Sequence, residues 1–365
     1  MTTHSSYPIY YADSLSRYLE IIRDINAHAQ HGKKSEDIAR MWYRGHEKDY
    51  YTLLPTLFRS KAATEDFYGY NHLREDMRYQ HFRSKNTHLV TTSPESKIEW
   101  QEILQHHFGK TRLLDWSESA ISSLMFALEA FIDPKNDREL NHRRMNMTPT
   151  VWVLDAKRLN QHIFAFFRGH QDYIETAVRD VLGPTLDGSP AQVQLTASIK
   201  EQLDYLEDFF EDDREHGING VVCLSVIEGE RRANTERLYN MLLHREFNPF
   251  FYLLLRFYND GIPVPMDTLP PLAIVHPYHS RRIEYQHGVF TIVPHYQIEK
   301  KQCGTVYDLR PMENQSSTQD CLFRINITRP AKVAKELLMM GTRRVDLYPD
   351  IEVYVRDMEA QGWGI

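Results

Sequence analysis

The chain has 365 residues, of which 42% are hydrophobic and 25% charged, a balance that is typical of globular proteins and excludes disordered and fibrous classes. Its 43 Lys and Arg and 50 Asp and Glu leave a net charge of −7, which argues against a broad electrostatic grip on nucleic acid. No apolar run reaches the roughly 18 residues of a membrane helix. The three cysteines lie far apart, and the N-terminus lacks the layout of a signal peptide. We therefore expect a soluble, cytoplasmic protein without disulfides, a structural metal or a membrane contact.

The first part of the chain is predicted to mix helices and strands. Apolar spacing and strand-forming runs indicate, in order, a helix, a strand, a helix and a strand at residues 14–30, 41–47, 96–108 and 111–116. A further helix follows, with Ser117 or Ser119 as its cap. The polar stretch at 133–149 is predicted to be exposed.

The second part has no regular alternation of strand and helix. Strands are predicted at 151–156, 221–227, 272–276, 289–293 and 321–327. Helices are predicted within 156–216, at 238–258, at 330–341 and after Pro349. This irregular order favours an α+β fold over a doubly wound sheet. Neither GxGxxG nor GxxxxGK[ST] occurs, so Rossmann and P-loop folds lose their main support.

Arg44 and Gly45, near the end of the first predicted strand, form the first candidate site. A planar guanidinium beside a residue without a side chain suits bidentate binding of a phosphate or a ribose. An arginine paired with a buried carboxylate is the alternative, and the local sequence alone favours it.

The segment 111–117, TRLLDWS, places two charges in an apolar stretch. Because an unpaired buried charge is costly, Arg112 and Asp115 are each expected to have a specific partner. Asp115, Trp116 and Ser117 lead into a helix N-terminus, whose N–H groups favour an anion. Simple capping by Asp115 or Ser117 explains the same residues equally well.

Two further groups of polar residues carry weaker signals. His106 and His107 are adjacent on a helix and point in different directions, unlike the i, i+4 pairs of helical metal ligands, so no metal is predicted there. Gln286 precedes a strand, where its amide suits either a sugar hydroxyl or the loop backbone, and nothing local decides between them. No GxSxG, HExxH or nucleophilic cysteine motif supports a hydrolase.

Taken in order, these segments resemble the FRG domain family, which is named for its (F/Y)RG motif. The similar stretches are WYRGHEKDYYTLLPTLFR at 42–59, LQHHFGKTRLLDWSESAISSLMFALE at 104–129, RRIEYQHGVFTIVP at 281–294 and ELLMMGTRRVDLYPDIEVYV at 336–355. Because they are spread over the chain, the resemblance implies one domain over 1–365. Its parts would be a helical segment at 1–40, a motif-bearing core at 41–300 with a helical insertion at about 156–216, and a C-terminal strand and helices at 301–365.

The layout of this family is similar, by analogy, to that of ADP-ribosyltransferase-like domains. The similarity implies a mixed, split sheet with helical additions, and NAD held by three motifs that correspond here to Arg44-Gly45, to 115–126 and to Gln286. The residues that it implies for NAD binding are Tyr43, Arg44, Gly45, Arg112, Asp115, Trp116 and Ser117. Arg44, Glu284 and Gln286 would act in catalysis. A glutamate is usual at the third motif, and Glu284 lies on the same side of an extended chain as Gln286, so either residue is a candidate.

Three functions follow as hypotheses. The first is an NAD-consuming enzyme, which transfers ADP-ribose to a protein or a nucleic acid or hydrolyses NAD. There Arg44 would anchor the pyrophosphate, Tyr43 or Trp116 would stack on nicotinamide, and a carboxylate or amide would stabilise the positive charge that develops on the ribose. The usual company of the family implies a bacterial antiphage defence or toxin-like role, with an inhibitor protein as a partner. The second is a non-catalytic nucleotide or nucleic-acid sensor, and the third is a metal-dependent nuclease using His106 or His107 with Asp115.

Overall fold

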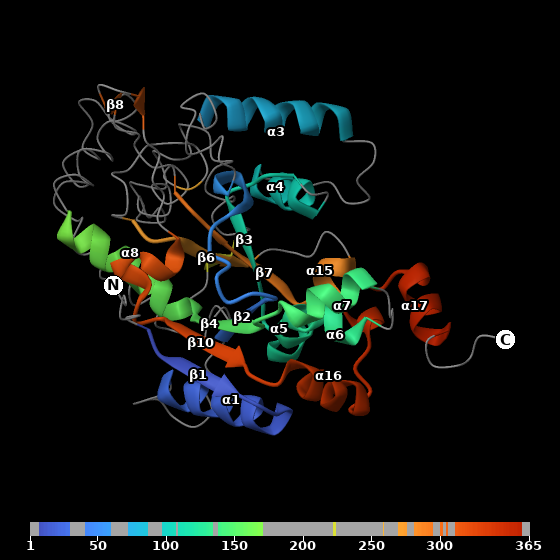
Figure 1. The fold of residues 1–365 in the computed structure, drawn as a ribbon. Helices are drawn as coiled ribbons and strands as arrows, with labels where there is room; N and C mark the ends of the chain where they lie inside the picture. The colour runs from blue at the N-terminus through green and yellow to red at the C-terminus, as the bar shows by residue number, and fades with distance from the viewer. Residues whose placement is uncertain are drawn as a thin grey trace, which may run out of the picture.

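The computed structural model describes residues 7–29, 41–59, 72–86, 97–106, 109–133, 138–170, 222–223, 258, 269–275, 281–294, 300–301, 304–305 and 311–359. Helices surround an eight-stranded mixed sheet in this part of the chain, which confirms the expected α+β class (Figure 1). The strand order is β1-β10-β4-β2-β3-β7-β6-β5. The strands are β1 (Ile9–Ala12), β2 (Met41–His46), β3 (Leu113–Ser117), β4 (Thr150–Asp155), β5 (Val222–Cys223), β6 (Leu272–Val275), β7 (Gly288–Ile292) and β10 (Leu322–Ile327). Two short strands, β8 (Lys300–Lys301) and β9 (Gly304–Thr305), form a separate pair.

The two halves of the sheet meet at a weakly paired seam between β2 and β3. These antiparallel strands share one paired position, Tyr43 with Ser117. On either side of the seam the pairing is longer, because β2 pairs with β4 over Met41 to His46 and β3 pairs with β7 over Leu113 to Ser117. The ladder that joins the halves therefore stops after one pair.

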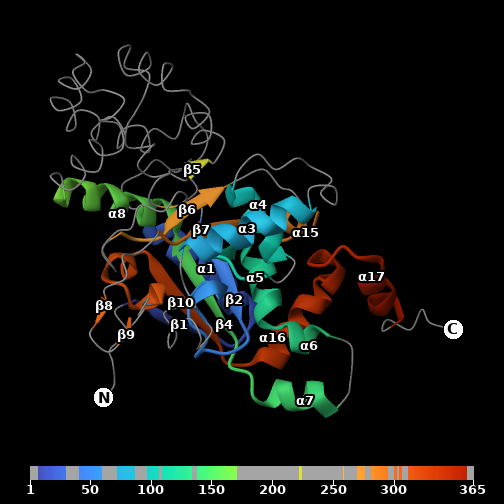
Figure 2. The same cartoon turned by 90° about the horizontal axis from the view of Figure 1, so that it is seen from above.

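The described residues form ten α-helices. They are α1 (Leu15–Ala29), α3 (His72–Asn86), α4 (Lys97–His106), α5 (Ala120–Ala127), α6 (Glu129–Ile132), α7 (Arg138–Met145), α8 (Ala156–Gly169), α15 (Arg281–Tyr285), α16 (Pro330–Met339) and α17 (Ile351–Met358). Short 3₁₀ turns occur at η1 (Thr56–Phe58), η4 (Met312–Asn314), η5 (Ser316–Thr318) and η6 (Arg344–Asp346). The helices α3 and α4 lie side by side in both views (Figure 1, Figure 2). No helix among the described residues is both long and apolar enough to span a bilayer.

Hydrophobic cores cover both faces of the sheet, so its central strands are apolar almost throughout. Along β4, Val151 and Val153 join the core under α1, α5 and α16, whereas Trp152 and Leu154 join the core under α8. This alternation follows from the period of two in a strand. Burial on both faces explains why β2, β3 and β4 could be predicted from runs rich in apolar and strand-forming residues.

Two local expectations need correction. The spacing of Leu15, Leu19, Ile22 and Ile25 on one face predicts the helix at 14–30, which is present as α1, but Leu19 is exposed and Tyr18 and Ile21 are buried in its place. The stretch at 133–149, predicted to be exposed, contains α7, and its Leu140 is buried with Ala130 and Met147. The helix predicted at 238–258 and most of the proposed insertion at 156–216 lie outside the described residues.

Candidate functional site

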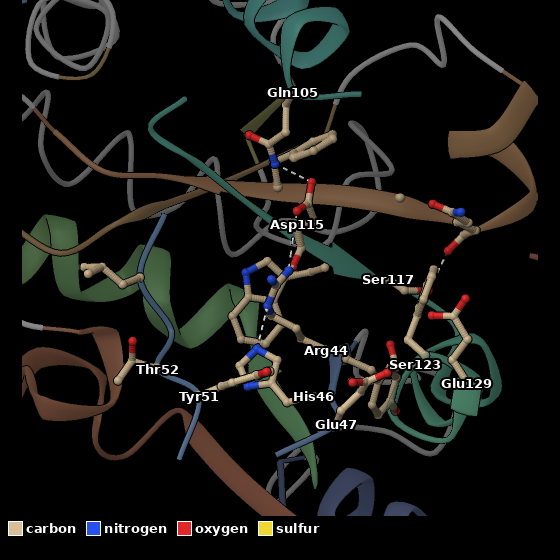
Figure 3. Close-up of a pocket in the computed structure, with 18 of the residues that line it drawn as sticks. Arg44, His46, Glu47, Tyr51, Thr52, Gln105, Asp115, Ser117, Ser123 and Glu129 are labelled. Atoms are coloured by element: carbon tan, nitrogen blue, oxygen red, sulfur yellow. Dashed lines mark hydrogen bonds and ion pairs between the residues drawn. The ribbon is translucent and has the colours of Figure 1, made fainter. Parts of the chain in front are cut away.

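A pocket of about 880 Å³ opens where the ladder between β2 and β3 stops (Figure 3). Its volume lies within the range of small-molecule sites, about 300–1,000 Å³. The wall is made by β2, the segment that follows it as far as Arg59, α4, β3, α5, α6 and the segment from Arg282 to Phe290. All three predicted motifs therefore contribute to one pocket.

Most of the residues proposed from the sequence reach this pocket, and two do not. Those in its wall are Tyr43, Arg44, Gly45, Asp115, Trp116, Ser117 and Gln286. Arg112 and Glu284 lie outside the wall.

Arg44 lies at the centre of the pocket, with its guanidinium held from two sides (Figure 3). Its Nε donates to Nε2 of His46 at 3.0 Å, and its Nη1 donates to the backbone carbonyl of Asp115. The Asp115 carboxylate lies 3.5 Å from the same nitrogen, and its side chain is 53% exposed. Arg44 is thus paired with a carboxylate, as the alternative prediction held, but that carboxylate faces solvent at the pocket.

The electrostatics of this region favour an anion. Burial lowers the pKa of Arg44, and Asp115 opposes that shift. Burial, followed by the charges of Arg44 and Arg59, lowers the pKa of His46 to about 2, so the imidazole is neutral at physiological pH. Burial and the charge of Arg44 lower the pKa of Arg59 to about 10. The pKa values of Arg44 and Arg59 are lowered despite the opposing charge of Asp115, so the two guanidinium groups form a positive region in a wall that also carries Glu47, Glu102 and Glu129.

The Asp115 side chain is oriented by a chain of hydrogen bonds. Its Oδ1 accepts from the amide nitrogen of Gln105, and the amide oxygen of Gln105 accepts from the hydroxyl of Thr111. Asp115 does not cap the next helix, because Ser119 accepts from the backbone N–H of Ser122 at 3.1 Å. The capping alternative is thus wrong for Asp115.

Ser117 connects the second motif to the third. Its hydroxyl donates to the backbone carbonyl of Gln286 at 2.7 Å and accepts from the backbone N–H of Ser119 at 3.0 Å. Ser117 therefore fixes the distance between β3 and the segment that precedes β7.

Gly45 is required by packing against α5. A Cβ at this position would lie 1.9 Å from the carbonyl oxygen of Ser123 and 2.7 Å from the backbone nitrogen of Ala127. The glycine thus permits the close approach of α5 to β2, and this approach places Ser123 in the pocket wall. Gly45 is therefore needed for steric reasons, in addition to leaving the backbone accessible to a ligand.

The aromatic residues expected to stack on a ligand are largely part of the cores. Tyr43 packs in the core under α1 and α5, and Trp116 packs with Trp42 and Trp152. The Trp116 indole N–H donates to Thr291 at 3.1 Å. The exposed rings in the pocket wall are Tyr50 and Tyr51, which the sequence analysis did not single out although they lie in the family-like stretch at 42–59.

The third motif has a different local structure from the one predicted. Residues 281–285 form the helix α15, where an extended chain was expected. Successive helical residues turn by about 100°, so positions 284 and 286 do not share a side as they would in a strand. Glu284 is exposed outside the pocket, whereas Gln286 is in its wall and donates from Nε2 to the carbonyl of Leu347 at 2.9 Å.

Arg112 is a structural residue. It is fully buried, and its Nη1 donates to the carbonyl of Val293 at 2.7 Å. The expected specific partner is thus present, but the expected contact with a cofactor is not supported by its position.

Several wall residues were missed by the sequence analysis, and most of them are carboxylates or their neighbours. Glu47 pairs with Arg143 through both carboxylate oxygens, with Oε2 at 3.1 Å from Nε. Glu102, Ser123 and Glu129 also line the pocket. Glu102, Ser123 and Glu129 lie on helices and Glu47 directly follows β2, and nothing in the local sequence pattern distinguished them from ordinary polar surface residues.

A metal site finds no support in the described residues. They contain no group of three His, Cys, Asp or Glu side chains that could hold a metal ion. His107 and the side chain of His106 lie outside the described part of the chain.

Comparison with known proteins gives one match. The family model of the FRG domain matches residues 39–136, which include β2, β3, α5 and α6. No curated protein and no solved structure matches the chain. The match covers two of the three motifs that meet at the pocket, those of Arg44 and Asp115, and it agrees with the resemblance found in the sequence. The chain therefore contains an FRG domain, at residues 39–136.

Proposed function

We propose that the pocket binds NAD and that the protein cleaves the bond between nicotinamide and ribose. The observation that carries this proposal is the convergence of three separate motifs on one pocket whose wall holds Arg44 and Arg59. ADP-ribose then passes to water or to a protein or nucleic-acid acceptor. Consumption of NAD deprives a cell of an essential cofactor, and on this ground the proposal extends to a defence or toxin-like role.

The two arginines suit the pyrophosphate of NAD. A guanidinium offers a planar fork of N–H donors that matches phosphate oxygens. Arg59 is held through Nε by the carbonyl of Leu54 at 2.6 Å, and within the described residues no carboxylate lies within ion-pair distance of it. Because His46 is neutral, its Nε2 accepts the hydrogen bond from Arg44 Nε and orients the guanidinium without adding a positive charge.

The reaction needs a negative or polar group beside the ribose. When the bond breaks, its electron pair leaves with nicotinamide and positive charge develops on the ribose, as in glycoside cleavage. The Gln286 amide nitrogen is engaged by Leu347, so Gln286 suits positioning of the wall. Carboxylates that line the pocket, among them Glu129, suit stabilisation of the charge.

A non-catalytic nucleotide sensor is the second candidate. The specific observation in its favour is the third motif, where an amide stands in the wall and Glu284 lies outside it. A sensor needs the arginines and the stacking tyrosines but no carboxylate beside the ribose.

The test measures NAD affinity and nicotinamide release for the wild type, Arg44→Ala and Arg23→Ala. Arg23 is a matched control, because it is an exposed arginine on α1 that pairs with Asp24. Loss of charged hydrogen bonds predicts at least about tenfold weaker NAD binding for Arg44→Ala, with no change for Arg23→Ala. Full NAD affinity in a folded Arg44→Ala would overturn the proposal. Binding by the wild type without any release of nicotinamide would favour the sensor.

A further inference from the structure

We infer that Ser123 and Glu129 form a subsite for the hydroxyls of a sugar that follows the diphosphate of the ligand. The inference rests on the proposed function and deepens it. By this inference, the pocket recognises a nucleoside diphosphate joined to a second sugar, in preference to a nucleoside diphosphate alone.

The first observation is an unsatisfied hydroxyl. Ser123 is 1% exposed and lines the pocket, and its Oγ has no hydrogen-bond partner among the described residues. A buried hydroxyl without a partner is costly, so such groups in native proteins have a ligand or water as the partner. Figure 3 shows Ser123 with Glu47 and Glu129 on one side of the pocket, apart from Gln105.

The second observation is the charge of the neighbouring carboxylates. Both oxygens of Glu47 are engaged by Arg143. Glu129 lies 3.7 Å from Nη2 of Arg344, which is beyond hydrogen-bond distance, and it interacts with the Tyr348 hydroxyl. Because a carboxylate has about four lone-pair sites, Glu129 retains acceptor capacity toward the pocket.

Together, Ser123 and Glu129 favour a ligand group that both donates and accepts a hydrogen bond. A sugar hydroxyl can donate to the Glu129 carboxylate and accept from the Ser123 hydroxyl, whereas a fully ionised phosphate has no proton to donate to Glu129. The positive potential of Arg44 and Arg59 lies in the same pocket. A ligand that occupies both regions therefore carries phosphates and a polyol, which is the chemistry of ADP-ribose.

The experiment compares the affinities of ADP-ribose and ADP, two ligands that differ by the second ribose. The variants are Ser123→Ala and Glu129→Gln. The control is Ser122→Ala, because Ser122 is a buried serine on the same helix that does not line the pocket. Ser123→Ala removes an unpartnered group from a helix and introduces a good helix former, so it should fold as the wild type does.

The subsite predicts that ADP-ribose binds more tightly than ADP to the wild type. Ser123→Ala should weaken ADP-ribose binding by about three- to tenfold, the effect of one lost hydrogen bond, and leave ADP binding unchanged. Glu129→Gln should do the same, and Ser122→Ala should change neither. Equal losses for both ligands, or none in Ser123→Ala, would refute the subsite alone. A wild type that binds neither ligand nor NAD would refute the proposed function with it.

Discussion

Gly45→Ala tests whether the pocket depends on the close approach of α5 to β2. The new Cβ would lie 1.9 Å from the Ser123 carbonyl oxygen, so about 1.5 Å of movement is needed to reach an ordinary contact of 3.4 Å. Ser123 and Ala127, the two residues it would meet, are an i, i+4 pair of α5, so the methyl group would press on the helical backbone itself. Neither side chain can rotate out of the way, and the helix has to shift.

Overpacking of this kind costs about 3 kcal/mol when backbone must move, which corresponds to a fall in Tm of roughly 4 °C for a chain of 365 residues. Gly169→Ala is the control, since Gly169 is the last residue of α8 and a Cβ there meets no atom of the described residues within 4 Å. That variant should be neutral or more stable by up to about 1 kcal/mol. Thermal unfolding and ADP-ribose affinity would be measured for both. A Gly45→Ala protein that melts with the wild type, or a Gly169→Ala protein that loses as much, would refute the packing explanation.

Three other predictions use the same assays. The pKa of His46 is about 2 in the folded protein and near 6.5 in the unfolded chain. On acidification from pH 7 to pH 5, His46 is therefore protonated in the unfolded chain but not in the folded protein. This group should lower the free energy of unfolding by about 2 kcal/mol between pH 7 and pH 5, and a His46→Gln variant whose denaturation is equally pH-dependent would contradict that. Arg112→Ala should lower the free energy of unfolding, measured with denaturant, by about 3 kcal/mol and leave the ligand affinity of the folded protein unchanged. An Arg112→Ala variant with wild-type stability and weaker binding would show that Arg112 has a binding role. Glu284→Gln should keep wild-type nicotinamide release, and a loss of release with NAD binding intact would make Glu284 the catalytic acid.

The sequence was informative about the strands and about the order of the motifs. Runs rich in apolar and strand-forming residues predicted β2, β3 and β4, because both faces of the sheet are covered. Strand periodicity also separates Arg112 from Asp115. The two are three positions apart in an extended segment, so they point to opposite sides. Arg112, Leu114 and Trp116 are buried, whereas Asp115 is exposed in the pocket wall.

The remainder of the site depends on tertiary packing that no local pattern encodes. Ser122 and Ser123 are neighbours on one helix, and only the position of Gly45 against α5 decides which of them reaches the pocket. The five residues of α15 are too few for a helical period to be recognised, so Glu284 was placed on the wrong side of the chain.

The seam between the halves of the sheet explains why Arg44 is central. If the register of Tyr43 with Ser117 continued, Gly45 would lie opposite Asp115, but the ladder stops before that pair. The Asp115 carbonyl instead accepts from the Arg44 side chain. Arg44 thus replaces a missing backbone hydrogen bond between the halves and presents its charge in the pocket that the missing pair leaves open. Because one guanidinium serves both purposes, an anion that draws it away from Asp115 acts directly on the contact that joins the two halves.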